Sequence, residues 1–171
     1  MLSIRAIKKD TLHNVMLQQM YSLNYVWMRI EGLIQQRTPE VYGSEEYHQL
    51  FEDYGSEEAR RLIKTLGFPR EKIKDLARFL KYSHWVIFEN IEIAELTANS
   101  FRMRTLDCSA QRAARRWGLP YYDCATGGLR IRNGFFKGIN PEAKVQRVFA
   151  PPESRPGGRA VVSCEWLISL E

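Results

Sequence analysis

The sequence lacks any apolar run approaching the roughly 20 residues that a membrane-spanning helix requires. Its first ten residues, MLSIRAIKKD, contain no apolar segment of the kind found in secretory signal peptides. Cysteine is scarce, with three in 171 residues, and no two of them form a C-x-x-C motif. These absences predict a cytoplasmic protein with reduced thiols and no membrane association, and they argue against a secreted, disulfide-stapled fold.

No nucleic-acid-binding motif accompanies the net charge of +5. Residues 101–171 contain 12 Lys and Arg against 6 Asp and Glu, whereas residues 1–100 contain 13 against 14. Ten of those 12 cations are Arg, whose planar guanidinium suits carboxylate or phosphate groups. A solvated, Arg-rich face is the favoured interpretation, and nucleic-acid binding through this basic half is the less favoured one.

Apolar residues make up 44% of the chain, enough for one folded domain over residues 1–171. Residues 10–36 have the period of a long amphipathic helix. Its apolar stripe consists of Leu12, Met16, Met20, Leu23, Trp27, Ile30 and Ile34. This stripe is expected to pack on the rest of the domain or to pair with a second copy, which would make the protein a homodimer.

The helical pattern continues to about residue 84. The motif YGSEE occurs at 42–46 and again at 54–58, and each copy offers a Ser N-cap followed by two acidic residues. Residues 45–66 therefore form either two helices or one helix with Gly55 inside it. Gly67 is a helix stop signal, and Pro69 suits the first turn of a following helix that buries Ile73 and Leu80.

The period changes after residue 84. Residues 85–96 are rich in β-branched and aromatic side chains, and the side chains of residues 101–108 alternate between two faces. Together the two segments predict a hairpin. Helices are expected near 110–117 and 129–136, and further strands over 144–150 and 159–170, with a turn between these two strands. The predicted fold class is α+β, with a helical N-terminal half (1–84) packed on a small, mostly antiparallel sheet with inserted helices (85–171).

The cysteines attract attention because Cys108 and Cys124, each preceded by Asp, frame one short basic segment. Cys164 shares a strand face with Trp166, so an antiparallel sheet could bring all three thiols together. Such a set could bind a zinc or iron ion as ligands, while packing as small apolar residues is the alternative. Cys124 is the best candidate for a reactive thiol, since a helix N-terminus lowers a thiol pKa. His84, at the junction of helix and strand, is the one histidine placed to act as its base, and a junction residue without a catalytic role is the favoured interpretation.

An ordered set of residues in the C-terminal half resembles an uncharacterised prokaryotic family, a domain of unknown function. The set is Cys108, Gln111, Gly118, Leu119, Pro120, Cys124, Gly128, Ile139, Pro141, Lys144, Pro151, Pro152, Cys164 and Trp166. The match covers about residues 100–168. More distantly, the pattern is similar to 2-amino-thiazoline-4-carboxylate hydrolase-like proteins and to 4-vinyl-reductase-like small-ligand domains.

The resemblance implies that the three cysteines belong to one site. The chain departs from the family pattern at three points. It has RVFA where members often carry further cysteines, Asn140 in place of the Asp of Ile-Asp-Pro, and Glu153 in place of the Asp after Pro-Pro.

The favoured function is binding of a small anionic or partly apolar ligand. The residues expected to hold it are Arg102, Arg104, Arg112, Arg115, Trp117, Phe135, Phe136 and Trp166. The alternative is a thiol- or metal-dependent hydrolase-like enzyme, with Cys124 as nucleophile or metal ligand and Asp123, Asp107 or Glu165 transferring protons.

Overall fold

The computed structural model describes residues 8–153 and 162–170. The contacts of the chain group into two compact units, Met1–Pro39 and Glu40–Glu171. Whether the two units act as one domain stays a prediction. No helix within the described residues is long and apolar enough to cross a membrane.

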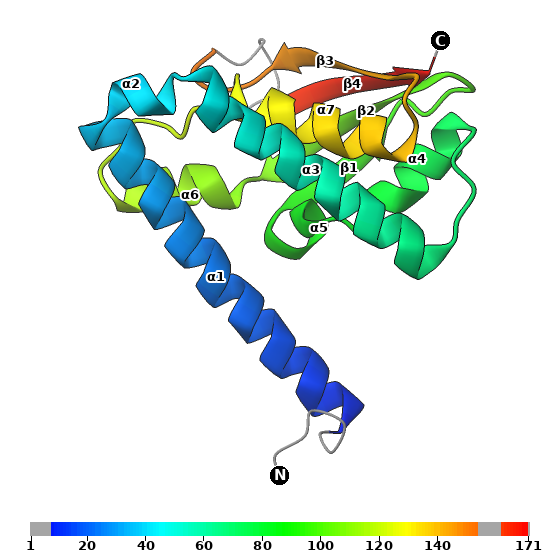
Figure 1. The fold of residues 1–171 in the computed structure, drawn as a ribbon, viewed down its shortest axis with the longest axis horizontal. Helices are drawn as coiled ribbons and strands as arrows, with labels where there is room; N and C mark the ends of the chain where they lie inside the picture. The colour runs from blue at the N-terminus through cyan, green and yellow to red at the C-terminus, as the bar shows by residue number, and fades with distance from the viewer. Residues whose placement is uncertain (1–7, 154–161, 171) are drawn as a thin grey trace. The chain divides into compact units, whose positions relative to one another are not determined.

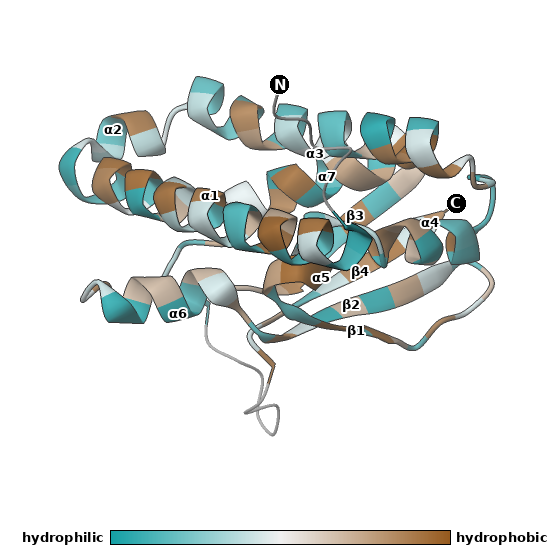
Figure 2. Cartoon of the chain, turned by 90° about the horizontal axis from the view of Figure 1, so that it is seen from below, coloured by the Kyte–Doolittle hydropathy of each residue, from teal (hydrophilic) through white to brown (hydrophobic). Residues whose placement is uncertain are grey.

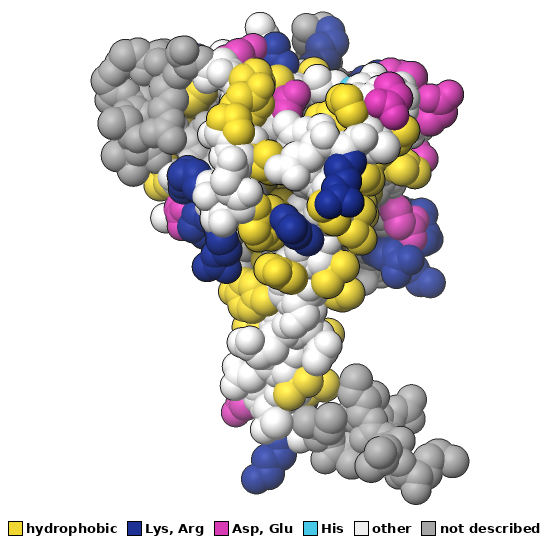
Figure 3. Space-filling view, turned by 90° about the vertical axis from the view of Figure 1, so that its left-hand side faces the viewer, with side chains coloured by type: hydrophobic (Ala, Val, Ile, Leu, Met, Phe, Trp, Pro, Cys, Tyr) yellow, Lys and Arg dark blue, Asp and Glu magenta, His cyan; other side chains and the backbone are white. Residues whose placement is uncertain are grey.

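The first unit is built on α1 (Lys9–Arg37), which confirms the helix predicted over 10–36. Its predicted apolar stripe is not a buried face, because Met16, Leu23 and Ile30 are about half exposed or more. Figure 3 shows apolar side chains reaching the surface along this helix. The short α2 (Pro39–Tyr42) follows it.

The second unit begins with one long helix, α3 (Glu45–Leu66), so the single-helix alternative for residues 45–66 is correct. The Ser44 side chain caps it by accepting a hydrogen bond from Tyr47 N. Gly67 ends it in the left-handed conformation, with φ of 60°, as predicted from the stop signal. The second YGSEE copy therefore lies inside the helix and does not start a new one.

Gly55 lies inside α3 because this helix packs closely on α7 (Gly127–Ile139), which runs alongside it in Figure 1. A Cβ atom at Gly55 would overlap the carbonyl oxygen of Ile131, and one at Gly134 would overlap that of Glu52. Glycine at these two crossing points lets the helix backbones touch.

Two sequence predictions in the following segment were wrong. Pro69 precedes the next helix instead of sitting in its first turn, since α4 spans Ile73–Leu80. Residues 84–88 form the short helix α5 (His84–Phe88), not the first half of a strand. This turn buries Trp85 against Phe135, with ring centroids 5.3 Å apart. A run of aromatic and β-branched residues can form either a strand or a short buried helix. Here the packing of Trp85 in the core favours the helix.

The sheet has four antiparallel strands in the order β1-β2-β4-β3. Their bounds are β1 (Asn90–Ala94), β2 (Ser100–Asp107), β3 (Ala143–Phe149) and β4 (Cys164–Leu170). Helices α6 (Ser109–Arg116) and α7 are inserted between β2 and β3. The α+β prediction is confirmed. Part of the turn and strand predicted over 151–170 falls on residues 154–161, outside the described residues.

Helices α3 and α7 lie on one side of the sheet, and the core fills the space between them and the strands (Figure 2). Phe101 and Met103 from β2 and Trp166 and Ile168 from β4 point into this core and are fully buried. Alternation along the strands places Arg102, Arg104 and Glu165 on the opposite face. The core edge nearest the start of β4 is where the cysteines lie.

Candidate functional site

The structure brings the three cysteines together from three different elements of the second unit. Cys108 lies between β2 and α6, Cys124 in the loop between α6 and α7, and Cys164 at the start of β4. Cys124 is near enough to Cys108 to raise the pKa of the Cys108 thiol. Cys164 is close enough to Cys108 for the charge of one to affect the pKa of the other. Cys108 and Cys164 are buried, whereas Cys124 is half-buried.

Glu89, the residue after α5, connects these thiols. Its carboxylate accepts hydrogen bonds from Cys108 Sγ at 3.6 Å and from Thr105 Oγ1 at 3.4 Å. Thr105 lies opposite Cys164 in the register of β2 and β4. We call Cys108, Cys124, Cys164, Thr105 and Glu89 the thiol cluster. The cluster adjoins the apolar core.

Burial controls the protonation of this cluster. It raises the pKa of the Glu89 carboxyl above its usual range, although the nearby positive charges of Arg132 and His84 oppose the shift. The neighbouring Cys124, burial and the charge of Glu89 raise the pKa of the Cys108 thiol well above its usual value. Burial likewise raises the pKa of Cys164. Cys108 and Cys164 are therefore neutral thiols near neutral pH.

Arg132, on α7, is the cation beside the cluster. It is 4% exposed, and its guanidinium lies 4.4 Å from the ring centroid of Trp166 and 4.9 Å from that of Trp85. One of its terminal nitrogens donates to Gly128 O at 2.9 Å, and its buried Nε has no hydrogen-bond partner. No carboxylate of the described residues forms an ion pair with it. A buried cation without a paired anion is rare in folded proteins.

Gly128 adjoins both Arg132 and Cys124. A Cβ atom at this position would lie 3.3 Å from a terminal nitrogen of Arg132, 3.4 Å from Cys124 Cβ and 3.5 Å from Trp166 Cζ2. The missing side chain thus leaves the volume of a methyl group among the arginine, the half-buried cysteine and the indole ring.

The loop that carries Cys124 is held by side chains. Gln111 exchanges two hydrogen bonds with the backbone of Tyr122, and its Nε2 also donates to Cys124 Sγ at 3.3 Å. The backbone N–H of Cys124 donates to Pro151 O at 3.0 Å. Asp123, predicted to handle protons, accepts from the N–H of Ala125 and stabilises the loop. These bonds fix the position of the Cys124 sulfur.

His84 does not pair with a cysteine. Its Nδ1 lies 2.7 Å from Glu58 Oε2, and its backbone N–H donates to the same carboxylate at 2.6 Å. The imidazole also packs on Trp85, with ring centroids 4.3 Å apart. The group that contacts Cys108 is Glu89, so the expected Cys–His pair is replaced by a thiol–carboxylate contact.

The metal interpretation of Cys108, Cys124 and Cys164 receives no support from this geometry. Within residues 8–153 and 162–170, no group of three or more His, Cys, Asp or Glu side chains is arranged to hold a metal ion. The raised pKa values of Cys108 and Cys164 point the same way, because metal ligation requires thiolates.

Two of the arginines predicted to bind ligand lie on the far face of the sheet. Arg102 and Arg104 both contact Glu165, at 2.7 and 3.3 Å, and Glu165 is fully buried beneath them. Both also pair with Glu95. Their charges are thus balanced by carboxylates of the protein, and the proton-transfer role of Glu165 stays a prediction.

The other predicted residues are spread over the second unit. Arg112 forms an exposed ion pair with Asp107, Arg115 is exposed, and Trp117 lies at the C-terminal end of α6. Phe135 and Phe136 are fully buried in the core and stack edge-to-face on each other. Trp166 contacts the cluster by donating a hydrogen bond to Cys164, and its ring lies beside Arg132. Whether the others bind a ligand stays a prediction.

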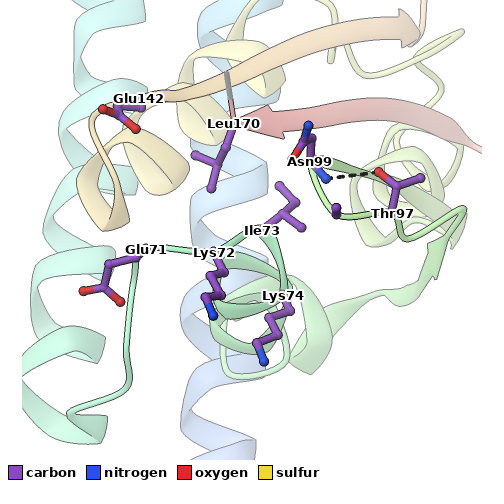
Figure 4. Close-up of a pocket in the computed structure, with 9 residues that line it drawn as sticks. Glu71, Lys72, Ile73, Lys74, Thr97, Asn99, Glu142 and Leu170 are labelled. Atoms are coloured by element: carbon purple, nitrogen blue, oxygen red, sulfur yellow. Dashed lines mark hydrogen bonds between the residues drawn. The ribbon is translucent and has the colours of Figure 1, made fainter.

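A separate hollow of about 460 Å³ lies between the start of α4 and the β1–β2 turn (Figure 4). Its walls carry charges of both signs, from Glu71 and Glu142 and from Lys72 and Lys74. Figure 4 shows the two lysine side chains extending away from Leu170 and Asn99. No residue of the thiol cluster lines it, and its mixed charge selects no ligand class.

A protein-family model matches residues 7–170 of the chain. The chain belongs to DUF6125, a family of unknown function. No curated protein matches the chain. The expected membership in a domain of unknown function is confirmed, and the match extends over both units of this DUF6125 protein.

Sequence reasoning missed Glu89 and Arg132. Glu89 stands in the run WVIFENIEI, which has the composition of a strand, so its carboxylate is expected to be solvated. Arg132 follows two glycines and an arginine in a helix with ordinary polar positions. The one available signal was Gly128, four residues before Arg132, which the family resemblance had already singled out.

Proposed function

We propose that this DUF6125 protein binds a small anionic ligand, with a carboxylate as the anionic group, beside the thiol cluster. The observation that carries the proposal is Arg132, a buried guanidinium beside two indole rings that forms no ion pair with a carboxylate of residues 8–153 or 162–170. Gly128, which has no side chain, adjoins both this guanidinium and Cys124.

The energetics favour an external anion. Burying a charge costs several kcal/mol unless it is paired and hydrogen-bonded. Glu89 offsets this cost only in part, because burial also disfavours its charged form. A bound carboxylate would accept charge-assisted hydrogen bonds from the guanidinium and lower the cost.

The aromatic rings suit a ligand with an apolar body. Trp85 and Trp166 fix the plane of the Arg132 guanidinium and present apolar surface beside it. This combination agrees with the distant similarity to 2-amino-thiazoline-4-carboxylate hydrolase-like proteins, whose named substrate is a small carboxylate.

The test is calorimetric titration with three probes at one ionic strength: 2-amino-thiazoline-4-carboxylate, benzoate and inorganic phosphate. We expect one of the carboxylates to bind the wild-type protein. Arg132→Met should weaken that binding at least about tenfold, since charge-assisted hydrogen bonds contribute about 1.5–3 kcal/mol. Met keeps the length and removes the charge.

Two controls accompany the titration. The uncharged amide of the carboxylate that binds should bind the wild-type protein weakly, and Arg102→Met, on the far face of the sheet, should leave binding unchanged. Failure of all three probes to bind the wild-type protein, or equal binding by Arg132→Met, would contradict the proposal.

A thiol-dependent hydrolase-like activity is the second candidate, and the position of Cys124 favours it. Cys124 is the half-buried thiol of the cluster, it adjoins Gly128 and Arg132, and its sulfur is held by Gln111. An anion bound at Arg132 would lie next to this nucleophile. Loss of turnover in Cys124→Ala with retained binding of the carboxylate probe would establish it, whereas unchanged turnover would exclude it.

A further inference from the structure

Cys124 is the cysteine of the thiol cluster that a reagent in solution can reach. Cys108 is 5% exposed and Cys164 is 3% exposed, whereas Cys124 is half-buried. The two buried sulfurs also have partners, because Cys108 Sγ donates to Glu89 and Cys164 Sγ accepts from Trp166 Nε1 at 3.2 Å. Chemical modification of the folded protein is therefore expected at Cys124.

A buried cation lies next to this cysteine. Cys124 Cβ and a terminal nitrogen of Arg132 both lie within 3.4 Å of one point, the position that a Cβ atom of Gly128 would occupy. Arg132 is 4% exposed, and one of its N–H groups donates to Gly128 O at 2.9 Å. Its Nε is buried and has no hydrogen-bond partner among the described residues. The guanidinium thus keeps a donor for an anion beside the Cys124 side chain.

The start of α7 adds positive potential at the same place. Cys124 lies three residues before Gly127, where α7 begins, and the Thr126 side chain makes no capping hydrogen bond to the first turn. The N–H groups of the first helical turn attract anions, and the helix dipole has the same effect. An anionic group between Arg132 and Cys124 is therefore stabilised by both the guanidinium and the helix.

We propose that Cys124 is a site of reversible S-thiolation, at which its sulfur reacts with a small disulfide that carries a carboxylate. Arg132 holds the carboxylate, and this positions the S–S bond of the reagent against the Cys124 sulfur. The inference rests on the proposed anion site and adds the class of covalent partner, a low-molecular-weight disulfide of a thiol acid.

The exchange balances without a further oxidant. The Cys124 thiol gives its proton to water, and its sulfur attacks one sulfur of the reagent. The new S–S bond joins Cys124 to that half of the reagent, the old S–S bond breaks, and the other half leaves as a thiolate that takes up a proton. One protein thiol and one disulfide thus yield one mixed disulfide and one small thiol, and an excess of thiol reverses the exchange.

The experiment compares two disulfides of similar size and different charge, dithiodiglycolate and its uncharged diamide. The reduced protein is incubated with each, and intact mass and peptide mapping follow the adduct with time. We expect one adduct per chain, on Cys124, which dithiothreitol removes. The ratio of the dithiodiglycolate rate to the diamide rate should exceed the ratio for a free thiol, N-acetylcysteine amide, at least about tenfold, because charge-assisted hydrogen bonds favour the carboxylate.

The variants separate the roles. Arg132→Met should lower this ratio to that of the free thiol while the rate with the diamide stays unchanged. Arg102→Met removes the same charge from the far face of the sheet and should keep the wild-type ratio, which excludes attraction by the net charge of the protein. Cys124→Ser should form no adduct, because Cys108 and Cys164 are buried. Circular dichroism checks that each variant is folded.

An adduct on Cys108 or Cys164, or no adduct on the folded protein, would overturn the proposal. A wild-type ratio equal to that of the free thiol, or an unchanged ratio in Arg132→Met, would overturn it as well. Failure of the proposed function is distinguishable, because Cys124→Ser has no thiol at this position. Its calorimetric titration with the carboxylate probes measures anion binding alone.

Discussion

Glu89 is the residue on which the chemistry of the interior depends. Its carboxylate lies among two thiols, a hydroxyl and a buried guanidinium, and it accepts hydrogen bonds from Cys108 and Thr105. Burial raises the pKa of the Glu89 carboxyl, whereas the positive charge of Arg132 lowers it. Burial has the larger effect, so the pKa is raised overall.

This balance predicts a pH dependence of stability. A carboxyl whose pKa is higher in the folded than in the unfolded state contributes stability below its unfolded pKa, of about 4.3, and this contribution is lost as the pH rises through the folded value. The wild-type protein should therefore lose stability relative to Glu89→Gln as the pH rises above about 4.5. Urea unfolding of both proteins from pH 4.5 to pH 8 measures the difference, and a difference that does not change with pH would contradict the assignment.

Arg132 shows why single residues of the site escape sequence reasoning. The three cysteines were found because cysteine is rare and its spacing is visible, but an arginine or a glutamate is expected at the surface. Only the tertiary fold reveals that Trp85 and Trp166 enclose one arginine while carboxylates pair with Arg102 and Arg104.

At the scale of elements, the packing of α3 on α7 positions the site, because α7 carries both Gly128 and Arg132. The two helices touch through small residues, and a Cβ atom at Gly138 would also lie only 2.9 Å from Ala59 Cβ. Such contact leaves no room for adjustment at the crossing points.

Two glycines of α7 provide a matched pair for a test. Gly134→Ala should lower the free energy of unfolding by about 1–3 kcal/mol or more, because its methyl group would overlap the α3 backbone at Glu52. Gly127→Ala, whose methyl would meet the Phe51 ring at 3.5 Å, should cost no stability. Urea denaturation measures both, and equal stabilities would show that the helices do not pack as described.

The elements themselves were largely predictable. The α1 period, the Ser44 and Gly67 signals and the alternation in β2 each reflect local physics, and they placed these elements within a residue or two. Helix α5 was missed because five aromatic and β-branched residues become helical only when Trp85 packs in the core. Whether residues 45–66 form one helix depended on α7, which lies more than 60 residues away in the chain.

At the scale of the whole molecule, α1 bears on the oligomeric state. Met16, Leu23 and Ile30 are exposed and stand seven residues apart, the spacing of a coiled-coil seam. We propose that α1 pairs with the α1 of a second copy, as the sequence led us to expect for a homodimer.

Light scattering coupled to size-exclusion chromatography tests this pairing. The wild-type protein should have twice the mass of one chain, and the double variant Leu23→Glu and Ile30→Glu should have the mass of one chain, since charges in the seam oppose association. The exposed change Arg115→Glu serves as a control that leaves the dimer intact. A wild-type monomer at high micromolar concentration would contradict the proposal.

The central claim is that the space between Gly128, Arg132 and Cys124 receives an anionic ligand, and Gly128→Ala tests it most directly. The added methyl enters that space without changing any charge, and Gly128 has no positive φ that would make alanine strained. In calorimetric titration with the carboxylate that the wild-type protein binds, we predict that Gly128→Ala binds at least about tenfold more weakly while remaining as stable as wild type. Unchanged affinity in this folded variant would place the ligand elsewhere and contradict the account.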